Sequence, residues 1–426
     1  MDTIDGTRAE SLIAEFGSPL FVVSERKMRE QIRILRAAFV SKCGRCIVAY
    51  SYKTNYLPGL CAIARQEGLW AEVVSEVEYG IAELVGVQGD RIIFNGPWKS
   101  EAGLRRAAEN GSVLNADSLD EILRINRIGE VIKKTISVGI RVNFRDMCGL
   151  RQSRFGINVE GGDALSAVRI ARDLRRVHPV GLHLHLGTNI NDPFAYSVAA
   201  KQICTFAKEL QDSLGLEMCY FDLGGGFPCA DTPPKWAFGG RGNEEWVTPP
   251  IEIYAEALTH TLMNNISSFK QEPILIVEPG RFIVGPSVFL LTKVISKKRQ
   301  NGILLVVVDA GLNLVPSAQY LRHPMKPATL RSTTTATTVV CGPSCSEYDI
   351  LGHVEMPEPQ LGDTLVVCAV GAYSISASTQ FSFQRPAVVM IGLEGEPEVL
   401  RKPELHCDLW RLDQIPSRLQ QRSTRE

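Results

Sequence analysis

The chain has 426 residues, enough for one or two domains with a large buried interior. Lys and Arg total 46 against 47 Asp and Glu, so the net charge of −1 lacks the basic excess of a nucleic-acid or anionic-membrane binder. Hydrophobic residues make up 45% and charged residues 22%, which excludes a largely disordered or fibrous chain. We therefore expect a globular protein that binds a small molecule, with no nucleic acid and no membrane among its partners.

The first ten residues are polar and lack the apolar stretch of a secretion signal, and the longest apolar run, residues 303–308, is too short to span a bilayer. Eleven cysteines without a regular spacing are typical of reduced thiols. Cys43 and Cys46 have CxxC spacing, but without a second pair they favour ordinary buried thiols over a metal or redox site. We expect a cytoplasmic protein without a bound metal.

From residue 46 onward, short apolar runs alternate with segments of helical periodicity. A first helix is predicted at residues 24–39. The predicted strands are 46–50, 70–74, 91–94, 112–115, 136–142, 180–185, 220–223 and 274–278. The predicted helices between them are 57–67, 77–85, 100–109, 119–128, 164–175, 193–214 and 251–267. This makes about eight βα units in roughly 240 residues, the rhythm of a TIM barrel, with a doubly wound sheet as the alternative.

After residue 278 the pattern changes to strands without helices, at 287–295, 303–309, 337–341, 363–369 and 387–392. We predict an α/β TIM barrel over residues 24–285 and an all-β domain, of sandwich or barrel type, formed by residues 1–23 and 286–410. The strand-like run 20–23 is expected to pair with this C-terminal β domain. Residues 411–426 are predicted to be a flexible tail.

Reactive side chains follow the predicted strands at their C-terminal ends, where TIM barrels carry their chemistry. Lys53 comes directly after the first strand, in YSYKTN (residues 50–55). A low-dielectric pocket there is expected to lower the pKa of this lysine and free its amine for Schiff-base chemistry, whereas a lone lysine is otherwise a surface charge. The other strand ends carry Glu72, Asn95, Asp117, Arg141, Asn143, His185, Gly224, Gly225, Gly226, Glu278 and Arg281.

Two strand ends suit a phosphorylated ligand. The glycines of DLGGGFP (residues 222–228) leave backbone N–H groups able to bind a phosphate, although a sharp turn also requires glycine. EPGR (residues 278–281) places a carboxylate and a guanidinium within one turn, which suits one cationic and one anionic group on the same ligand.

His183 and His185 suggest a competing enzyme class. They are two residues apart on a predicted strand and so point to the same face, as zinc ligands do in barrel hydrolases. Such a site needs further ligands at later strand ends, and none of the other histidines, of seven in the chain, has such a position. The metal interpretation is therefore the weaker one.

Together these segments resemble the fold-type III pyridoxal-phosphate decarboxylases, the family of ornithine, diaminopimelate and arginine decarboxylases. The resemblance extends from Tyr50 to Pro386. It rests on YSYKTN (50–55), GLHLHLGT (181–188), LGGGFP (223–228), EPGR (278–281), CGPSC (341–345) with Asp349, and GAY (371–373). The fold that it implies, a barrel followed by a β domain, agrees with the periodicity.

The resemblance implies pyridoxal 5′-phosphate as the cofactor, held by Lys53 in a Schiff base, with His185 stacked on its ring. Glu278 would bind the protonated pyridine nitrogen, which keeps the ring an electron sink when carbon dioxide departs. The remaining positions implied beside the cofactor are Glu72, Arg154 behind the ring and, for the phosphate, Thr188, Gly225, Gly226, Arg281 and Tyr373.

Members of this family are head-to-tail homodimers whose active sites borrow the Gly-Pro-x-Cys loop from the other subunit. The resemblance therefore implies a homodimer with shared active sites, in which Cys345 reprotonates the α-carbon across the interface. The substrate-binding positions expected on this basis are Asp349, Ser346, Glu347 and Tyr320.

Two departures from the family concern the substrate. The residue after the catalytic Cys is Glu in diaminopimelate decarboxylases and Asp in ornithine decarboxylases, whereas here it is Ser346. The Arg that follows the family's DAGxN segment is absent, because residues 314–317 read LVPS. Burying the zwitterionic end of diaminopimelate without these partners would cost roughly several kcal/mol. Glu347, after a loop shift, and Asp349 still offer carboxylates.

We therefore favour decarboxylation of an L-amino acid, or of a conjugated or carrier-bound amino acid, in specialised biosynthesis of the siderophore or antibiotic type. The alternative is an ornithine, lysine or diaminopimelate decarboxylase of primary metabolism. An amino-acid racemase would use a tyrosine instead of Cys345. A non-catalytic homologue would be expected to have lost Lys53 or Cys345, and both are present.

Overall fold

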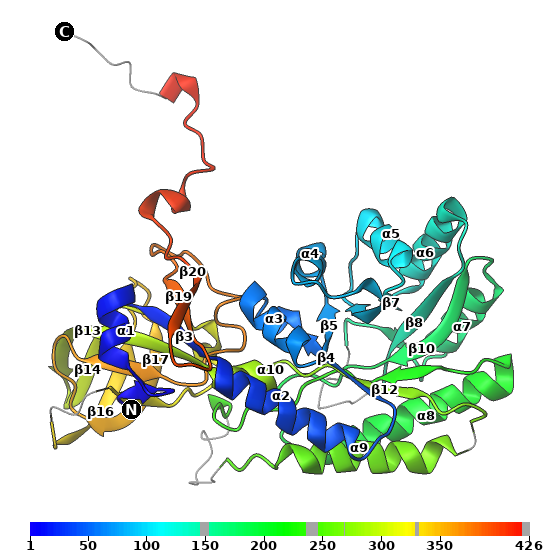
Figure 1. Ribbon diagram of the computed structural model, residues 1–426, viewed down its shortest axis with the longest axis horizontal. Helices are drawn as coiled ribbons and strands as arrows, with labels where there is room; N and C mark the ends of the chain where they lie inside the picture. Colours follow the sequence, from blue (N-terminus) through cyan, green and yellow to red (C-terminus); the bar gives the residue numbers. More distant parts are fainter. Residues whose placement is uncertain (145–152, 236–245, 268, 329–331, 420–426) are drawn as a thin grey trace.

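The structure is a computed structural model that describes residues 1–144, 153–235, 246–267, 269–328 and 332–419. Within these residues, eight parallel strands close into a barrel, because the series β10-β11-β12-β4-β5-β6-β7-β8 is completed by pairing of β10 with β8. The predicted TIM barrel is thus confirmed (Figure 1). Its strands are β4 (Cys46–Ser51), β5 (Trp70–Val73), β6 (Ile92–Phe94), β7 (Val113–Ala116), β8 (Ile136–Asn143), β10 (Val177–His183), β11 (Tyr220–Asp222) and β12 (Ile274–Val277).

Helices cover the outside of the barrel. Several begin at a serine directly after a strand or loop, and the serine hydroxyl accepts a hydrogen bond from the backbone N–H three residues later, which caps the helix. Ser24, Ser75, Ser100 and Ser118 have this role. The helices are α2 (Glu25–Val40), α3 (Pro58–Gln66), α4 (Glu76–Leu84), α5 (Glu101–Glu109), α6 (Leu119–Ile132), α7 (Asp163–Asp173), α8 (Phe194–Leu214), α9 (Ile251–Ile266) and the short α10 (Arg281–Val284).

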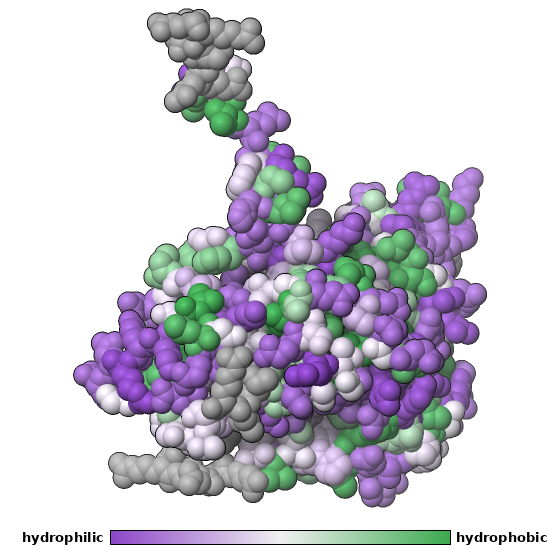
Figure 2. All heavy atoms as spheres, turned by 60° about the vertical axis from the view of Figure 1, so that its left-hand side comes forward, coloured by the Kyte–Doolittle hydropathy of each residue, from purple (hydrophilic) through white to green (hydrophobic). Residues whose placement is uncertain are grey.

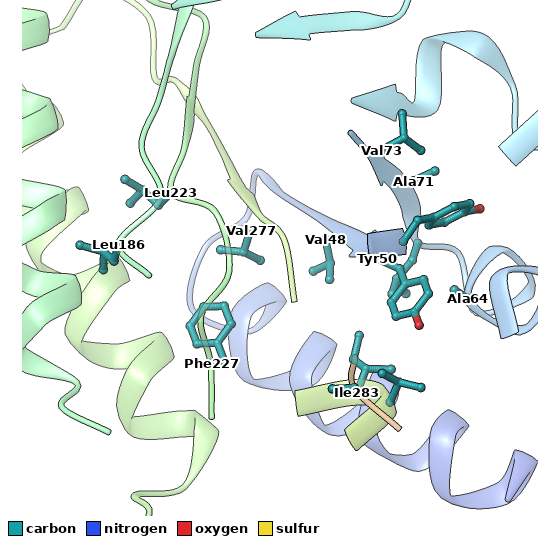
Figure 3. Close-up of a cluster of buried hydrophobic side chains, with 14 of the residues drawn as sticks. Val48, Tyr50, Ala64, Ala71, Val73, Leu186, Leu223, Phe227, Val277 and Ile283 are labelled. Atoms are coloured by element: carbon teal, nitrogen blue, oxygen red, sulfur yellow. The ribbon is translucent and has the colours of Figure 1, made fainter. Parts of the chain in front are cut away.

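The strands divide their side chains between two cores. Val48 and Tyr50 belong to the large core between strands and helices (Figure 3). Ala49 lies between them in sequence and belongs instead to a small apolar cluster with Ile93, Tyr220 and Ile276, against which Trp70 and Val113 pack. Alternation along a strand sends successive side chains to opposite faces, so this second cluster fills the barrel interior.

The same alternation positions the polar residues of the barrel mouth. Each lies two residues after a member of the interior cluster or a residue packed on it, and therefore also points inward. These residues are Ser51, Glu72, Asn95, Asn115, Asp222 and Glu278.

A second sheet is built from both ends of the chain. β3 (Leu20–Ser24) pairs antiparallel with β13 (Val288–Gln300) and parallel with β19 (Ala387–Ile391), which confirms the expected pairing of the N-terminal run with C-terminal strands. The sheet order is β17-β16-β14-β13-β3-β19-β20, and β18 joins β13 to β15. The further strands are β14 (Ile303–Val308), β15 (Met325–Pro327), β16 (Thr335–Cys341), β17 (Ile350–Pro357), β18 (Thr364–Val367) and β20 (Pro397–Arg401).

Several small elements were not predicted: α1 (Ala9–Phe16), β1 (Thr3–Ile4), β2 (Thr7–Arg8), β9 (Ile157–Asn158), β15, β17 and β20. β17 contains Gly352, His353 and Glu355, which obscure the apolar pattern of a strand. After β20 the chain extends away from both parts, with Trp410 and Leu412 exposed (Figures 1 and 2). Residues 420–426 of the predicted tail lie outside the described residues. None of the described helices combines the length and apolarity that a membrane span requires.

Candidate active site

Three carboxylates meet at the C-terminal ends of the barrel strands. Glu72 and Asp222 have no exposed surface, and Glu278 is 3% exposed. The side-chain amide of Asn95 joins two of them, because its Nδ2 donates to Glu278 Oε1 at 2.5 Å and to Glu72 Oε1 at 3.1 Å. Asp222 accepts from the backbone N–H of Gly224 at 3.0 Å and from Asn115 at 3.1 Å. So many buried acids together require a cation or shared protons.

Lys53 supplies the cation. It lies in a short 3₁₀ turn, Tyr52–Thr54, that follows β4, and its Nζ is 2.5 Å from Glu72 Oε2. Burial alone would lower the pKa of this lysine, but the charges of Glu72 and Glu278 outweigh it and raise the pKa above its usual value. The expected lowering of the pKa is therefore wrong, because the fold brings two buried acids close enough to Lys53 for their charges to outweigh the effect of burial.

The carboxylates themselves differ in protonation. Burial alone would raise the pKa of Glu72, yet the Lys53 charge and hydrogen bonds from Lys53, Ser51 and Asn95 lower it. Burial, with the neighbouring acids Asp222 and Glu72, raises the pKa of Glu278 well above its usual value. Burial also raises the pKa of Asp222 to about 7. Glu72 is thus the ionised partner of Lys53, whereas burial favours the protonated forms of Asp222 and Glu278.

The glycine turn follows β11 and lies against the EPGR segment. A side chain at Gly225 would overlap the backbone carbonyl of Glu278, and one at Gly226 would overlap the carbonyl of Gly187. The backbone N–H of Gly225 donates to His185 Nδ1 at 3.2 Å. Burial, together with the nearby cations Lys53 and Arg141, lowers the pKa of His185 to about 3, so its ring is neutral. The strand β10 ends at His183, two residues before the predicted end.

Arg281 stands beside this turn at the start of α10. Its Nη2 donates to Thr188 Oγ1 at 3.5 Å, and its guanidinium lies 5.2 Å from the ring centre of Tyr373. Arg281 is 6% exposed, and its Nε has no hydrogen-bond partner among the described residues. A buried guanidinium with an unused donor, next to a glycine turn that no side chain can fill, is a fitting site for a phosphate.

His183 gives a possible metal group. Its ring, together with Asp222 and Glu278, offers ligand atoms within 4.8 Å of one another, and His183 Nε2 lies 3.8 Å from Glu278 Oε2. Neither ring nitrogen has a hydrogen-bond partner among the described residues. Burial, with the nearby cations, lowers the pKa of His183 well below its usual value, so the ring is neutral and close to both acids. The sequence prediction paired His183 with His185 and did not include these two acids.

The predicted residues of the Cys loop lie in a different place, in the turn between β16 and β17. Cys345, Ser346 and Glu347 are exposed there. Asp349 is buried and accepts from the backbone N–H groups of Leu312 at 2.7 Å and Ser344 at 3.0 Å, so its carboxylate fixes the shape of this turn. A cavity of about 730 Å³ adjoins it, lined among others by Lys235, Ser344, Ser346, Asp349 and His353.

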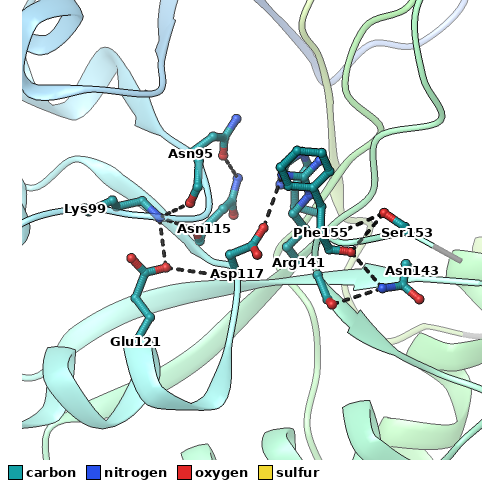
Figure 4. Close-up of polar contacts among 12 residues, drawn as sticks. Asn95, Lys99, Asn115, Asp117, Glu121, Arg141, Asn143, Ser153 and Phe155 are labelled. Atoms are coloured by element: carbon teal, nitrogen blue, oxygen red, sulfur yellow. Dashed lines mark hydrogen bonds and ion pairs between the residues drawn. The ribbon is translucent and has the colours of Figure 1, made fainter.

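Two further predicted residues stand apart from the acid cluster. Arg154 is exposed and lies over its neighbour Phe155, 4.0 Å from the ring centre. The cation that reaches the barrel interior on this side is Arg141, which pairs with Asp117 at 3.2 Å (Figure 4). Tyr320 is half exposed, and its backbone carbonyl accepts from the N–H of Lys235 at 2.9 Å.

Comparisons with known proteins identify this arrangement. Residues 26–285 match the family model described as "Pyridoxal-dependent decarboxylase, pyridoxal binding domain". This chain belongs to the fold-type III pyridoxal-phosphate-dependent decarboxylases. It is 31% identical to the diaminopimelate decarboxylase of Methanothermobacter thermautotrophicus, over 98% of this chain and 97% of the relative. The corresponding enzyme of Methanocaldococcus jannaschii is 29% identical, over 98% and 95%.

Solved structures agree with these relatives. The diaminopimelate decarboxylase of M. jannaschii in complex with L-lysine superposes with a TM-score of 0.90 at 28% identity, covering 98% of this chain and 97% of that one. The lysine/ornithine decarboxylase of Vibrio vulnificus shares the fold, with a TM-score of 0.76 at 22% identity, covering 91% and 97%. The protein is therefore a pyridoxal-phosphate-dependent carboxy-lyase that acts on an amino acid. The comparisons support primary metabolism and do not support the specialised biosynthesis that we favoured from the sequence.

The residues of the barrel mouth fit this cofactor. The Lys53 amine suits the aldehyde of pyridoxal phosphate, and the buried acids suit its basic ring nitrogen. The glycine turn with the Arg281 guanidinium suits its phosphate. The unpartnered ring of His183 is close enough to the acids to belong to the same site, so these residues provide no separate evidence for a metal.

Proposed function

We propose that this enzyme removes carbon dioxide from diaminopimelate and releases lysine. Support comes from the similarity to diaminopimelate decarboxylases over nearly the whole chain, and from the relative whose structure contains L-lysine. Within the site, the observation that carries the proposal is the contact of Lys53 with Glu72, joined through Asn95 to Glu278.

In this proposal Lys53 would hold the cofactor and Glu278 would bind its pyridine nitrogen. Bound pyridoxal phosphate supplies an electron sink for the electron pair left when carbon dioxide departs. Glu72 orients the Lys53 amine and stabilises its proton, because its carboxylate is hydrogen-bonded to Nζ at 2.5 Å. His185, a neutral imidazole, would hold the ring of the cofactor.

The phosphate is assigned to Thr188, Gly225, Gly226, Arg281 and Tyr373. Arg281 contributes a permanent charge and the unused Nε donor, and the glycine turn contributes backbone N–H groups. Because the Gly225 N–H donates to His185 Nδ1, the Gly226 N–H is the one assigned to the phosphate, and a side chain at either glycine would overlap a neighbouring carbonyl.

Cys345 is assigned as the proton donor to the carbon that loses carbon dioxide, acting in the site of a second copy of this chain. Its exposure on the turn between β16 and β17 makes it accessible to such a partner. Substrate contacts are assigned to Ser346, Glu347, Asp349 and Tyr320. Residues 314–317 lack the arginine that binds the distal carboxylate of the substrate in the family. Lys235, which lines the adjoining cavity, is the cation assigned to that carboxylate here.

A second candidate is an amino acid whose distal end is conjugated or carrier-bound. The observation in its favour is Ser346, an uncharged residue where diaminopimelate decarboxylases carry Glu.

A mass-spectrometric screen distinguishes the two. Purified protein loaded with pyridoxal phosphate is offered diaminopimelate, lysine, ornithine, arginine and acyl-conjugated diamino acids, and the loss of carbon dioxide is measured. Turnover of diaminopimelate to lysine is expected. If diaminopimelate loses no carbon dioxide while a conjugate does, the second candidate replaces the first. The variant Lys53→Ala is the control and should give no borohydride-reducible cofactor adduct; an adduct at another lysine would overturn the site assignment.

A further inference from the structure

A chain of buried hydrogen bonds crosses the barrel from Tyr220 to Glu278. The Tyr220 hydroxyl donates to Asn115 Oδ1 at 2.8 Å, and Asn115 Nδ2 donates to Asn95 Oδ1 at 2.9 Å (Figure 4 shows this second contact). Asn95 Nδ2 then donates to Glu278 Oε1 at 2.5 Å. None of these four side chains is more than 8% exposed, so water does not compete for the bonds.

The chain has one direction. The ionised Glu72 carboxylate only accepts, so Asn95 must turn its amino group toward Glu72 and Glu278, which leaves its oxygen facing Asn115. Asn115 must therefore turn its own amino group toward Asn95, and its second proton reaches Asp222. Its oxygen then needs a donor, and the Tyr220 hydroxyl is that donor. Burial raises the pKa of Tyr220 well above its usual value, so the hydroxyl keeps its proton.

Two glycines on neighbouring strands make room for Tyr220 in the barrel interior. A Cβ at Gly181 on β10 would overlap the Tyr220 ring, and a Cβ at Gly139 on β8 would overlap both the Tyr220 hydroxyl and Asn115 Oδ1. Two neighbouring strands thus carry glycine where the ring and its hydrogen bond lie. If the ring only filled space, phenylalanine would serve as well, because a buried hydroxyl requires a hydrogen-bond partner.

We propose that Tyr220 is a positioning residue for the cofactor: acting through Asn115 and Asn95, its hydroxyl holds the donor that keeps Glu278 able to bind the protonated pyridine nitrogen. The inference rests on the proposed assignment of Glu278 to that nitrogen and deepens it. Tyr220 touches neither Glu278 nor Lys53 directly in the hydrogen-bond pattern.

The charge balance around Glu278 explains why a distant hydroxyl matters. The titratable groups that face Glu278 are Asp222, Glu72, Lys53 and His183. Two of these are acids and oppose ionisation of Glu278, so its ability to bind a cation depends on the few donors that it has. Without the hydroxyl, Asn115 Oδ1 loses its donor, so Asn115 is held less firmly and with it the Asn95 amino group that donates to Glu278. A weaker donor at Glu278 favours its protonated form and weakens its hold on a protonated nitrogen.

The test is Tyr220→Phe, which keeps the ring and removes only the hydroxyl. Apoprotein is titrated with pyridoxal phosphate, and binding is followed by the visible absorption of the cofactor at several values between about pH 6 and about pH 9. We expect affinity to fall by up to about tenfold, since one buried hydrogen bond contributes about that much, and the loss to become smaller as the pH rises and ionises Glu278 in the variant as well. The matched control is Tyr79→Phe, which removes another buried hydroxyl, bonded to Ser112.

Equal behaviour of Tyr220→Phe and Tyr79→Phe in affinity and in its pH dependence would overturn the inference. Asn115→Asp is the second variant, because it keeps the shape and replaces the amide donor by an acceptor; wild-type binding by this variant would also overturn it. Failure of the wild-type protein to form a cofactor adduct at Lys53 would instead contradict the proposed function, so the two failures are distinguishable.

Discussion

The Lys53 ammonium and the Glu72 carboxylate form an ion pair at 2.5 Å in which the acid has no exposed surface. Ser51 and Asn95 complete the hydrogen bonds of that carboxylate. Because the two neighbouring acids outweigh burial and raise the pKa of Lys53, the free enzyme holds the lysine as an ammonium at neutral pH. Lys53 would bind the cofactor covalently only as the free amine, so Glu72, which stabilises the ammonium form, controls the pH at which attachment begins.

Glu72→Gln should make covalent attachment of the cofactor easier at low pH. Removal of the anion lowers the pKa of Lys53, and below both pKa values each unit of lowering gives about ten times more free amine. The expected outcome is that attachment, trapped with borohydride at a series of pH values, begins at lower pH than in the wild type. An unchanged or higher onset would show that Glu72 does not control the lysine proton.

Cys345→Ala should separate cofactor binding from product formation. The cofactor spectrum is expected to stay as in the wild type, because Cys345 lies outside the acid cluster, whereas amine output falls sharply and transamination products appear.

Mixing Cys345→Ala with Lys53→Ala, after reversible dissociation, tests whether sites are shared between two copies. A random mixture of equal amounts should regain about a quarter of wild-type activity, since half of the dimers are mixed and each of these has one intact site. No recovery, with exchange of subunits demonstrated, would place Cys345 and Lys53 of one chain in the same site.

Gly225→Ala should weaken cofactor binding without unfolding the protein. The added methyl overlaps the Glu278 carbonyl, so the glycine turn and the EPGR segment must separate, at a cost of about 1–3 kcal/mol to folding and a larger loss in phosphate affinity. Isothermal titration with pyridoxal phosphate measures the second effect. Gly44→Ala is the matched control, because open space surrounds that position.

Lys99→Met should destabilise the fold. Lys99 and Glu121 are 1% and 3% exposed and pair at 2.9 Å, and Lys99 also donates to two backbone carbonyls (Figure 4). Removal of one partner leaves a buried charge, which costs about 3–5 kcal/mol, measured by denaturant unfolding. Replacing Glu121 by Gln in the same chain should recover part of this loss; a larger loss in the double variant would contradict the explanation.

The barrel could be predicted because its strands carry apolar runs and its helices carry apolar residues at helical spacing, both visible in the sequence. Most barrel-mouth residues followed from reading the strand ends. Asn115 and Asp222 were given no role, although both lie two residues after an inward-facing residue. Counting in steps of two from Val113 and Tyr220 would have selected them.

Other features depend on distances that no pattern shows. Asp117 was selected as a strand-end acid, yet it pairs with Arg141, and the pKa of Lys53 depends on how many acids the closed barrel brings near it. The conjugated substrate was suggested by two missing charges, at Ser346 and within residues 314–317. Each concerns a single position, whereas similarity to diaminopimelate decarboxylases extends along the chain. Lys235 became a candidate cation only because folding places it in the cavity beside Asp349.

The position of β3 has a consequence for synthesis of the protein. Val23 pairs with Val288, and Val22 pairs with Val389. This strand is therefore synthesised early, but the strands that pair with it are synthesised only after the barrel. Until then its buried residues Leu20–Val23 have neither edge covered, and the nascent chain carries an apolar strand open to pairing with other chains. A ribosome-bound intermediate stopped after the barrel should therefore bind holdase chaperones through this strand.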